Sequence, residues 1–362
     1  MNYLKDLEKI ININSYTQNK AGVDKVGHIM SSWLEELGFT TQVFQRELIG
    51  DHLLHSTPKK KDLPSILLLG HNDTVFPKGY FEGYTEDESW IYGPGVCDMK
   101  GGNIVALEAI RNIIDKNASI SNIDFLLVSD EETGSDDSSF ITAELAADYD
   151  YCFVFEAAGP NLEVVTARKG VGTFTVTIEG VAAHAGTSYE KGIDANLEAT
   201  HKLQKFSALT NFDIGTTVNI GKIDGGIGAN TISPKCTMML EARFSKDVER
   251  DRVLKELQEI TDTPYIKGTK SNLSGLVQRD VMEENESQFN FIEQLEGITN
   301  EKILTENRGG VSDANITSSN GLLTLDGFGP YGDGDHTIHE RALKSSFEQR
   351  INLMTKILQY FQ

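Results

Sequence analysis

Three short apolar runs, each followed by acidic residues or a histidine, constrain the fold of this chain more than any other feature. The runs are Ser65–Gly70, Ile123–Ser129 and Tyr151–Phe155. Each has the length and apolar density of a strand that is buried on both faces, which is typical of a parallel sheet. The polar residues that follow them include His71, Asp73, Glu131, Glu132 and Glu156.

These polar residues predict a site at one edge of a sheet. In open α/β sheets, sites form just beyond the carboxyl ends of the strands. We therefore expect the side chains that follow the three runs to gather along one edge. Imidazole and carboxylate groups in one place indicate a divalent metal.

The segments between the runs read as helices and strands in alternation. Ile104, Leu107, Ile110 and Ile114 recur at helical spacing and predict a helix over Gly101–Ile114. Strand, helix and strand then alternate as far as the third run, which is the signature of βαβ units. The sequence thus predicts an α/β fold with a mostly parallel sheet flanked by helices.

The pattern changes after about residue 169. Alternating strands are expected at 172–180, 215–222 and 235–244, with helices at 195–206 and 248–260. This pattern predicts an antiparallel α+β unit inserted into the α/β domain. We expect residues 1–169 and 281–362 to form the catalytic, metal-binding domain and residues 170–280 to form the inserted domain.

Composition and charge exclude several classes of partner. The chain of 362 residues has a net charge of −21, which argues against nucleic acid and against anionic membrane surfaces. The three cysteines form no C-x-x-C pair and favour a reducing compartment. The N-terminal stretch has charges where a signal peptide needs an apolar core, and no apolar stretch is long enough to span a bilayer. A cytoplasmic protein is expected.

Two glycine-rich turns add further metal-ligand candidates. Gly93–Gly102 surrounds Asp98 just before a predicted helix, and Gly329–Glu340 carries His336. The complete set of candidate ligands is His71, Asp98, Glu132, Glu156 and His336. Because one catalytic zinc takes three protein ligands and a water, five ligands indicate two metals that share a carboxylate.

The residue types in this set suit zinc, with cobalt or manganese as less specific choices. Asp98 is the natural bridge because it stands alone on its turn. We assign Glu132 as the ligand and its neighbour Glu131 as the free base beside a bound water. Asp73 is expected to accept a hydrogen bond from the second ring nitrogen of His71 and fix its tautomer.

Six motifs together resemble a known family, the two-zinc aminoacyl-peptidases and deacylases. That family includes glutamate carboxypeptidase, acetylornithine deacetylase, succinyl-diaminopimelate desuccinylase and aminoacylase. The resemblance covers nearly the whole chain in order, and residues 166–199 most resemble the glutamate carboxypeptidase branch. The motifs are HNDTV (71–75), GPGVCDMKGG (93–102), DEETGS (130–135), FEAA (155–158), AAHAG (182–186) and GPYGDGDHTIHE (329–340).

The resemblance implies roles for the metal-site residues. It implies His71 and Glu156 on one zinc, Glu132 and His336 on the other, and Asp98 as the bridge. It also implies Glu131 as general base, Asp73 as the orienting partner of His71, and a cis peptide after Asp98. His339 lies three residues after His336 and leaves the choice of ligand there less secure, although the family loop favours His336. Cys97 is expected to pack and not to bind metal.

The resemblance also implies that the inserted domain is a lid that forms a homodimer. His184 would lie near the scissile carbonyl, in the same subunit or supplied by the partner. Asn230 would donate a hydrogen bond nearby. Arg243 would bind a substrate carboxylate, and Gly310 lies in a loop expected to line the same pocket.

The function expected from the sequence is hydrolysis of an amide bond to a C-terminal amino acid, in the manner of a glutamate-type carboxypeptidase. The substrate would be a small peptide or an N-acyl amino acid. The main alternative is an N-acyl amino acid deacylase of the acetylornithine deacetylase or succinyl-diaminopimelate desuccinylase type. A non-catalytic binding protein is disfavoured because all seven metal-site positions are present. A phosphatase or nuclease is disfavoured by the lack of basic clusters.

Overall fold

The computed structural model describes residues 3–117 and 119–362. Met1, Asn2 and Ala118, which all belong to the predicted catalytic domain, lie outside the described residues. Contacts divide the chain into two units, which are described separately below. The first unit comprises Met1–Ala167, Glu284–Arg308 and Ser312–Gln362, and the second comprises Arg168–Glu283 and Gly309–Val311.

The first unit is built on a mixed sheet with the strand order β1-β2-β6-β3-β7-β14. Its strands, in chain order, are β1 (Thr40–Phe44), β2 (His52–Ser56), β3 (Ile66–His71), β6 (Ile123–Val128), β7 (Tyr151–Val154) and β14 (Leu323–Leu325). β6, β3, β7 and β14 pair in parallel, whereas β1 and β2 pair antiparallel at one edge. The predicted α/β class with a mostly parallel sheet is therefore confirmed.

The three apolar runs form the centre of this sheet. Every residue of β3 and β6 is buried, and β7 is buried except for its first residue. Their carboxyl ends lie at one edge because the three strands run in the same direction. This edge carries the polar residues that the sequence places after each run.

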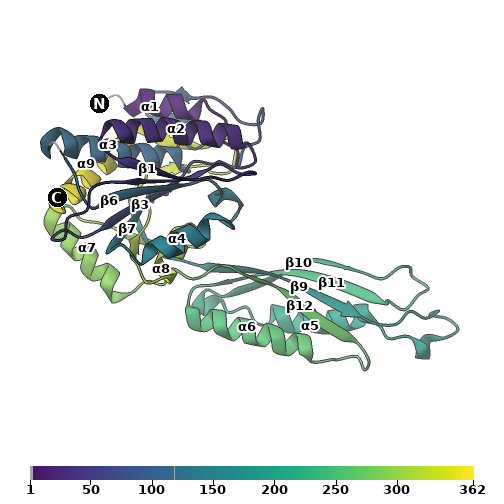
Figure 1. Cartoon of the computed structure of the whole chain (residues 1–362). Helices are drawn as coiled ribbons and strands as arrows, with labels where there is room; N and C mark the ends of the chain where they lie inside the picture. The colour runs from purple at the N-terminus through teal and green to yellow at the C-terminus, as the bar shows by residue number, and fades with distance from the viewer. Residues whose placement is uncertain (1–2, 118) are drawn as a thin grey trace. The chain divides into compact units, whose positions relative to one another are not determined.

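Helices cover both faces of the sheet. Figure 1 shows α1, α2, α3 and α9 on one side and α4 and α8 on the other. No helix among the described residues is long and apolar enough to cross a membrane. The helices of this unit are α1 (Tyr3–Ile11), α2 (Lys20–Glu36), α3 (Lys100–Asn117), α4 (Ser138–Ala146), α7 (Glu286–Thr299), α8 (Ala314–Ser319) and α9 (Lys344–Tyr360).

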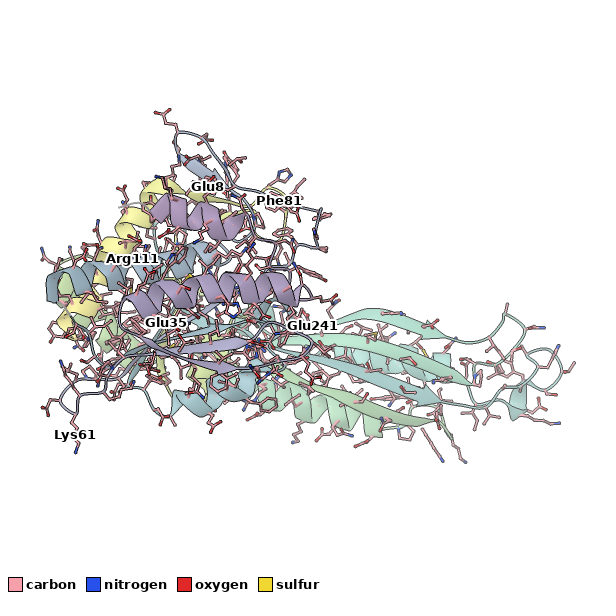
Figure 2. All side chains as sticks on the ribbon, turned by 45° about the horizontal axis from the view of Figure 1, so that its top comes forward. Glu8, Glu35, Lys61, Phe81, Arg111 and Glu241 are labelled. Carbon is pink, nitrogen blue, oxygen red and sulfur yellow. The ribbon has the colours of Figure 1, made fainter. Side chains whose placement is uncertain are left out.

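The predicted apolar stripe holds the main helical layer together. Ile104, Leu107 and Ile110 of α3 are fully buried in the core that also contains residues of α1 and α9. Arg111 projects from α3 (Figure 2) and its guanidinium lies 2.6 Å from the carboxylate of Asp6 on α1. The apolar stripe therefore sets the layer, and the ion pair adds a link at its surface.

A second, smaller sheet belongs to the first unit. Its strand order is β15-β16-β5-β4. β4 (Thr85–Glu86) and β5 (Trp90–Tyr92) lie between β3 and α3 in the chain, while β15 (Gly332–Asp333) and β16 (Arg341–Leu343) flank the turn that carries His336. The sequence predicted neither β4 nor β5, because strands of two or three residues show no periodicity. This sheet brings the Asp98 turn and the His336 loop together.

The second unit is an antiparallel sheet with the order β10-β11-β9-β12. Figure 1 shows both of its helices on the same face of the sheet. The long strands alternate buried and half-exposed residues, so one face packs on the helices and the other stays open. The elements are β9 (Gly170–Glu179), α5 (Ala195–Ser207), β10 (Thr217–Gly225), β11 (Lys235–Phe244), α6 (Asp247–Asp262) and β12 (Lys270–Arg279).

The second unit begins and ends slightly outside the predicted span of 170–280. Arg168 exchanges backbone hydrogen bonds with Met282 at 2.9 and 3.1 Å, which extends the β9–β12 ladder beyond both limits. The segment 309–311 also groups with this unit. Just before it, β13 (Thr305–Arg308) pairs with β8 (Val164–Arg168) in a separate two-stranded sheet.

A buried histidine of β2 makes the first unit sensitive to acid. His55 is fully buried between the Ser31 hydroxyl, 2.9 Å from its Nε2, and the backbone oxygen of Phe125, 3.1 Å from its Nδ1. Burial lowers the pKa of this imidazole to about 4. Between pH 6.5 and 4, His55 therefore takes up a proton in the unfolded chain but not in the folded protein. The free energy of unfolding falls as the pH is lowered through this range.

We predict that, between pH 7 and 4, the free energy of unfolding falls by about 3 kcal/mol less in His55→Gln than in the wild-type protein. Urea unfolding followed by tryptophan fluorescence measures it, because both tryptophans, Trp33 and Trp90, belong to the first unit. The variant starts less stable at pH 7, since Gln replaces a ring that has two partners. Equal slopes of stability against pH in the two proteins would contradict the prediction.

Candidate metal centre

The candidate ligands of the centre come from the end of a strand and from the turns and loops that follow strands. His71 is the last residue of β3, and Glu156 follows β7 by two residues. Glu132 lies in the short 3-10 helix η1 (Glu131–Thr133) that follows β6. Asp98 lies on the turn between β5 and α3, and His336 on the loop between β15 and β16. Residues distant in sequence thus converge at the carboxyl edge of the main sheet.

The Asp98 carboxylate divides its two oxygens between two histidines. Its Oδ1 lies 3.1 Å from Nε2 of His71, and the same nitrogen is 3.9 Å from Glu156. Its Oδ2 lies 3.2 Å from Nε2 of His336, which is 3.0 Å from Glu132. The centre therefore consists of two histidine–glutamate pairs joined by one aspartate.

These spacings fit metal ligands. Two ligands that each lie ~2.1 Å from one tetrahedral zinc are ~3.4 Å apart, and the nitrogen–oxygen distances above scatter around that value. Ligand atoms of His71, Asp98 and Glu132 also lie within 4.8 Å of one another and can hold a metal ion. The donor set contains only imidazole nitrogens and carboxylate oxygens, which suits a divalent cation.

The electrostatics of the cluster favour added positive charge. Burial and the neighbouring charge of Asp98 raise the pKa of Glu132 and Glu156 well above their usual values. Hydrogen bonds to Asp98 and Glu132 raise the pKa of His336 to about 11. Burial opposes ionisation of Asp98, but His336 and His71 offset it and lower the pKa of that carboxyl. Protons compensate the crowded carboxylates here, and a divalent cation can take the place of those protons.

Asp73 contacts His71 mainly through its backbone. The Nδ1 of His71 lies 3.0 Å from the backbone oxygen of Asp73 and 3.4 Å from its carboxylate. The other carboxylate oxygen of Asp73 accepts from the Thr17 hydroxyl at 2.6 Å and from the backbone N–H of Glu132 at 3.3 Å. Asp73 therefore contacts Nδ1 of His71, but the shorter of its two contacts is made by its backbone oxygen and not by the carboxylate that the sequence analysis expected.

The Asn103 side chain packs against the backbone at the end of β3, and this close approach requires glycine at position 70. Asn103 of α3 donates to the backbone oxygen of His71 at 2.7 Å. A Cβ at Gly70 would approach the side-chain oxygen of Asn103 to 2.1 Å. The glycine that precedes His71 thus allows α3 to pack close behind the first ligand.

Glu131 and Cys97 are the sequence neighbours of two candidate ligands, Glu132 and Asp98. Glu131 is half-buried beside Glu132, and its charge contributes to the raised pKa of both Glu132 and Glu156. Cys97 is fully buried, and burial raises the pKa of its thiol well above the usual range, so it packs as a neutral thiol. The Asp98–Met99 peptide is cis, as the resemblance implied.

The choice between the two histidines of the last loop is resolved by position. The His336 ring contacts Asp98 and Glu132 although 56% of its side chain is exposed. His339 lies on the exposed part of the same loop, and its backbone N–H donates to Thr337. The structure therefore brings His336 to the cluster.

Two of the predicted substrate residues lie side by side in the second unit. His184 pairs with Thr231 in an antiparallel bridge, and the N–H of Ala185 donates to the oxygen of Asn230 at 2.9 Å. The N–H of Gly186 donates to Nδ1 of His184 at 3.1 Å, which assigns the ring proton to Nε2. His184 and Asn230 are both exposed.

Arg243 and Gly310 form another local group in the same unit. The guanidinium of Arg243 donates to the backbone oxygen of Gly309 at 3.0 Å, and Gly310 accepts from Arg168 at 3.2 Å. Glu241, labelled in Figure 2 and two residues away on β11, accepts from Nε and Nη2 of Arg243 at 2.7 and 3.4 Å. The sequence did not anticipate this acidic partner, although spacing of two along a strand puts both side chains on one face.

Two buried residues beside the centre, Lys100 and Glu340, make contacts that the sequence did not predict. Lys100 is fully buried and donates to the backbone oxygens of Ile10 and Ile13 at 3.2 and 3.0 Å. Glu340 is 1% exposed and contacts the Asp98 turn. Both bind backbone atoms, which leave no signature in a sequence, so nothing in the residue pattern singled out these contacts.

Fold and site together define an α/β protein with a sheet-edge centre of five histidine and carboxylate side chains and a separate antiparallel unit. A family model, described as the peptidase dimerisation domain, matches residues 166–269. This match covers most of the second unit.

Two proteins of known name are similar to longer parts of the chain. Carboxypeptidase G2 of Pseudomonas sp. (strain RS-16) is 28% identical over 262 residues, which are 71% of this chain and 63% of that protein. Acetylornithine deacetylase of Proteus mirabilis (strain HI4320) is 30% identical over 234 residues, covering 60% of this chain and 59% of its own. The matched region thus spans less than two thirds of either relative.

The fold has a solved counterpart along its full length. The crystal structure of aminopeptidase PepT from Bacillus cereus ATCC 10987 matches with a TM-score of 0.83 at 21% identity and covers 99% of this chain and 98% of that one. The matches to the peptidase dimerisation domain, to carboxypeptidase G2 and to acetylornithine deacetylase confirm the resemblance that the sequence predicted.

Proposed function

We propose that this chain is a metal-dependent hydrolase that cleaves the amide bond to a C-terminal amino acid, as a glutamate-type carboxypeptidase. The observation that carries the proposal is the division of the Asp98 oxygens between two histidine–glutamate pairs. The similarity to carboxypeptidase G2 supports a carboxypeptidase activity, and the proposed substrate is a small peptide or an N-acyl amino acid. The three cysteines are free and buried, which is compatible with the cytoplasm as the proposed location.

The proposed cofactor is a pair of zinc ions, with cobalt or manganese as substitutes. His71, Glu156 and Oδ1 of Asp98 would hold one, and His336, Glu132 and Oδ2 of Asp98 would hold the other. Two such cations supply Lewis acidity, which polarises an amide carbonyl and lets water ionise near neutral pH.

Glu131 acts as the general base in this proposal. It lies next to Glu132 on η1, its carboxylate is half-buried, and its charge reaches both glutamate ligands. It takes the proton of the attacking water and passes it to the leaving amine. Asp73 holds the proton of His71 on Nδ1 and leaves Nε2 facing Asp98.

His184 donates to the oxygen of the scissile carbonyl as negative charge develops there. The Gly186 N–H occupies Nδ1 of the ring, so Nε2–H is the donor that remains for substrate. The nearby Asn230 amide adds a further donor at the same end of the unit.

Arg243 binds the carboxylate of the leaving amino acid. Its planar guanidinium suits two oxygens at once, and one of its nitrogens donates to the backbone oxygen of Gly309. Glu241 holds the same guanidinium and adds a negative charge, which favours a leaving amino acid with a cationic side chain over glutamate. This contact supports the second candidate, an N-acyl amino acid deacylase of the acetylornithine deacetylase type.

The distance between these groups within the second unit supports a homodimer. Arg243 lies at one end of β11, and His184 lies beside Thr231, beyond the other end at Lys235. The eight residue steps from Arg243 to Lys235 span about 27 Å. A small substrate held by Arg243 is therefore out of reach of His184 in the same subunit, and His184 would come from the partner. The match of residues 166–269 to a dimerisation domain agrees with this arrangement.

The first prediction concerns the general base. Glu131→Gln should lower kcat by about 10²–10⁴-fold, because it removes a positioned base, while two metal ions per chain remain bound. Turnover of N-acyl amino acids and elemental analysis of the dialysed protein measure the two effects. Loss of metal in this variant would exchange the roles of Glu131 and Glu132.

The second prediction concerns Arg243. Arg243→Ala should raise KM about 10–100-fold for N-acyl amino acids with a free carboxylate, because a charged hydrogen bond is worth about 1.5–3 kcal/mol. Arg250→Ala, which removes a half-buried arginine of α6 that pairs with Asp247 and Asp280, serves as the matched control and should leave KM unchanged. An unaltered KM in Arg243→Ala would remove this residue from the site.

A substrate pair separates the two candidate functions in the same assay. Glu241→Gln should lower KM for an N-acyl glutamate and raise it for N-acetylornithine, because it removes the negative charge beside the bound side chain. If wild-type enzyme prefers the glutamate substrate and the variant changes neither KM, Glu241 does not contact the leaving amino acid.

The third prediction concerns the two subunits. Glu131→Gln and His184→Ala are each expected to be nearly inactive, but a mixture allowed to exchange subunits should regain about one quarter of wild-type activity, since half of the dimers then hold one intact composite site. Activity before and after subunit exchange measures this gain. No recovery, with exchange demonstrated by differently tagged subunits, would place His184 in the same subunit as Glu131.

A further inference from the structure

One buried carboxylate collects the backbone N–H groups of the turn that carries Asp98. Oε1 of Glu340 accepts from Gly95 at 3.0 Å, from Cys97 at 3.1 Å and from Asp98 at 3.2 Å, and Oε2 accepts from Gly95 at 3.0 Å. The Cys97 thiol lies 3.5 Å from Oε1. Successive backbone N–H groups that point at one anion form a concave anion-binding turn, filled here by a side chain of the same protein.

The same residue belongs to the loop that carries His336. Glu340 follows His336 by four residues and directly precedes β16, which pairs with β5. Its backbone oxygen accepts from Gly93 at 3.4 Å, so side chain and backbone both contact the Gly93–Asp98 turn. One residue thereby connects the bridging aspartate to the loop of a candidate ligand more than 200 residues away in sequence.

The two halves of the centre differ in what supports them. His71 and Glu156 come from β3 and β7, neighbouring strands at the centre of the main sheet. His336 comes from a loop, has a backbone φ of 61°, and exposes 56% of its side chain. Its position relative to Asp98 therefore depends on contacts of the loop, and those that the Glu340 carboxylate makes with Gly95 and Cys97 are buried.

We propose that Glu340 is a positioning residue that fixes the Asp98 turn against the His336 loop and thereby controls metal occupancy of the His336–Glu132 half of the centre. The inference rests on the proposed two-metal function and adds a residue that does not itself bind metal. It predicts that loss of Glu340 weakens one metal site more than the other, because the sheet still holds His71 and Glu156.

The test compares Glu340→Ala and Glu340→Gln with the wild-type protein. Gln keeps one acceptor oxygen and nearly the same volume, so it should rescue part of the effect. Glu198→Gln is the matched control: Glu198 is also fully buried and accepts two backbone N–H groups, from Tyr265 and Ile266, but it lies in the second unit. Each metal-free protein is titrated with zinc in a calorimeter and with cobalt in the visible absorption spectrum.

Wild-type protein and Glu198→Gln should bind two equivalents, although Glu198→Gln unfolds at a lower temperature. Glu340→Ala should bind the first equivalent as wild type does and the second at least tenfold more weakly, with a cobalt spectrum that lacks the second increment. Glu340→Gln should lie between them and carries the test if the alanine variant does not fold.

Two results would overturn the inference. Equal affinities and an unchanged cobalt spectrum in both Glu340 variants would show that the carboxylate does not position the ligands. Equal weakening of both equivalents would remove the claimed selectivity for the His336–Glu132 half. If the wild-type protein binds no metal, both the proposed function and this inference fail. If the wild-type protein binds two metal ions and the Glu340 variants bind them equally well, only this inference fails.

Discussion

The structure depends on one carboxylate that faces two histidines at once. Asp98 offers Oδ1 to His71 and Oδ2 to His336, and each histidine has a glutamate at its other side. So many acidic groups in a buried position repel one another, and only added positive charge relieves the repulsion. Protons can supply this charge, but a pair of divalent cations supplies it with the ligand spacing that is already present.

The architecture explains how these groups come together. Parallel strands deliver His71 and Glu156 to one edge without further support, because the carboxyl ends of β3 and β7 coincide there. Asp98 and His336 need loops, and the small sheet formed by β5 and β16 brings those loops into contact. In the second unit, Arg243 lies near one end of β11 and His184 lies beside Thr231, beyond the other end.

Much of this could be predicted from the residue pattern. The strands β3, β6 and β7 can be recognised in the sequence because strands buried on both faces are continuously apolar. The ligand candidates follow those runs directly, so finding the strands also found the residues. β9 and β11 could also be recognised in the sequence. One face of each strand is packed and the other is open, so apolar and polar residues alternate along them.

The missed features share a physical cause. β12 is mostly exposed and has little apolar alternation, so it exists as a strand through its pairing with β9, a long-range interaction. β14 has only three residues. Glu340 and the Asp73 backbone oxygen act through backbone groups, and every residue type offers nearly the same backbone. The pairing of Glu241 with Arg243 became evident only when the side chains were placed on one strand face.

The central claim is that Asp98 bridges two metal ions. Anomalous X-ray diffraction from crystals grown with zinc tests it most directly. The account predicts two anomalous peaks roughly 3.5–4 Å apart, one beside each oxygen of Asp98, with His71 next to the first and His336 next to the second. A single peak, or two peaks of which neither contacts Asp98, would contradict it.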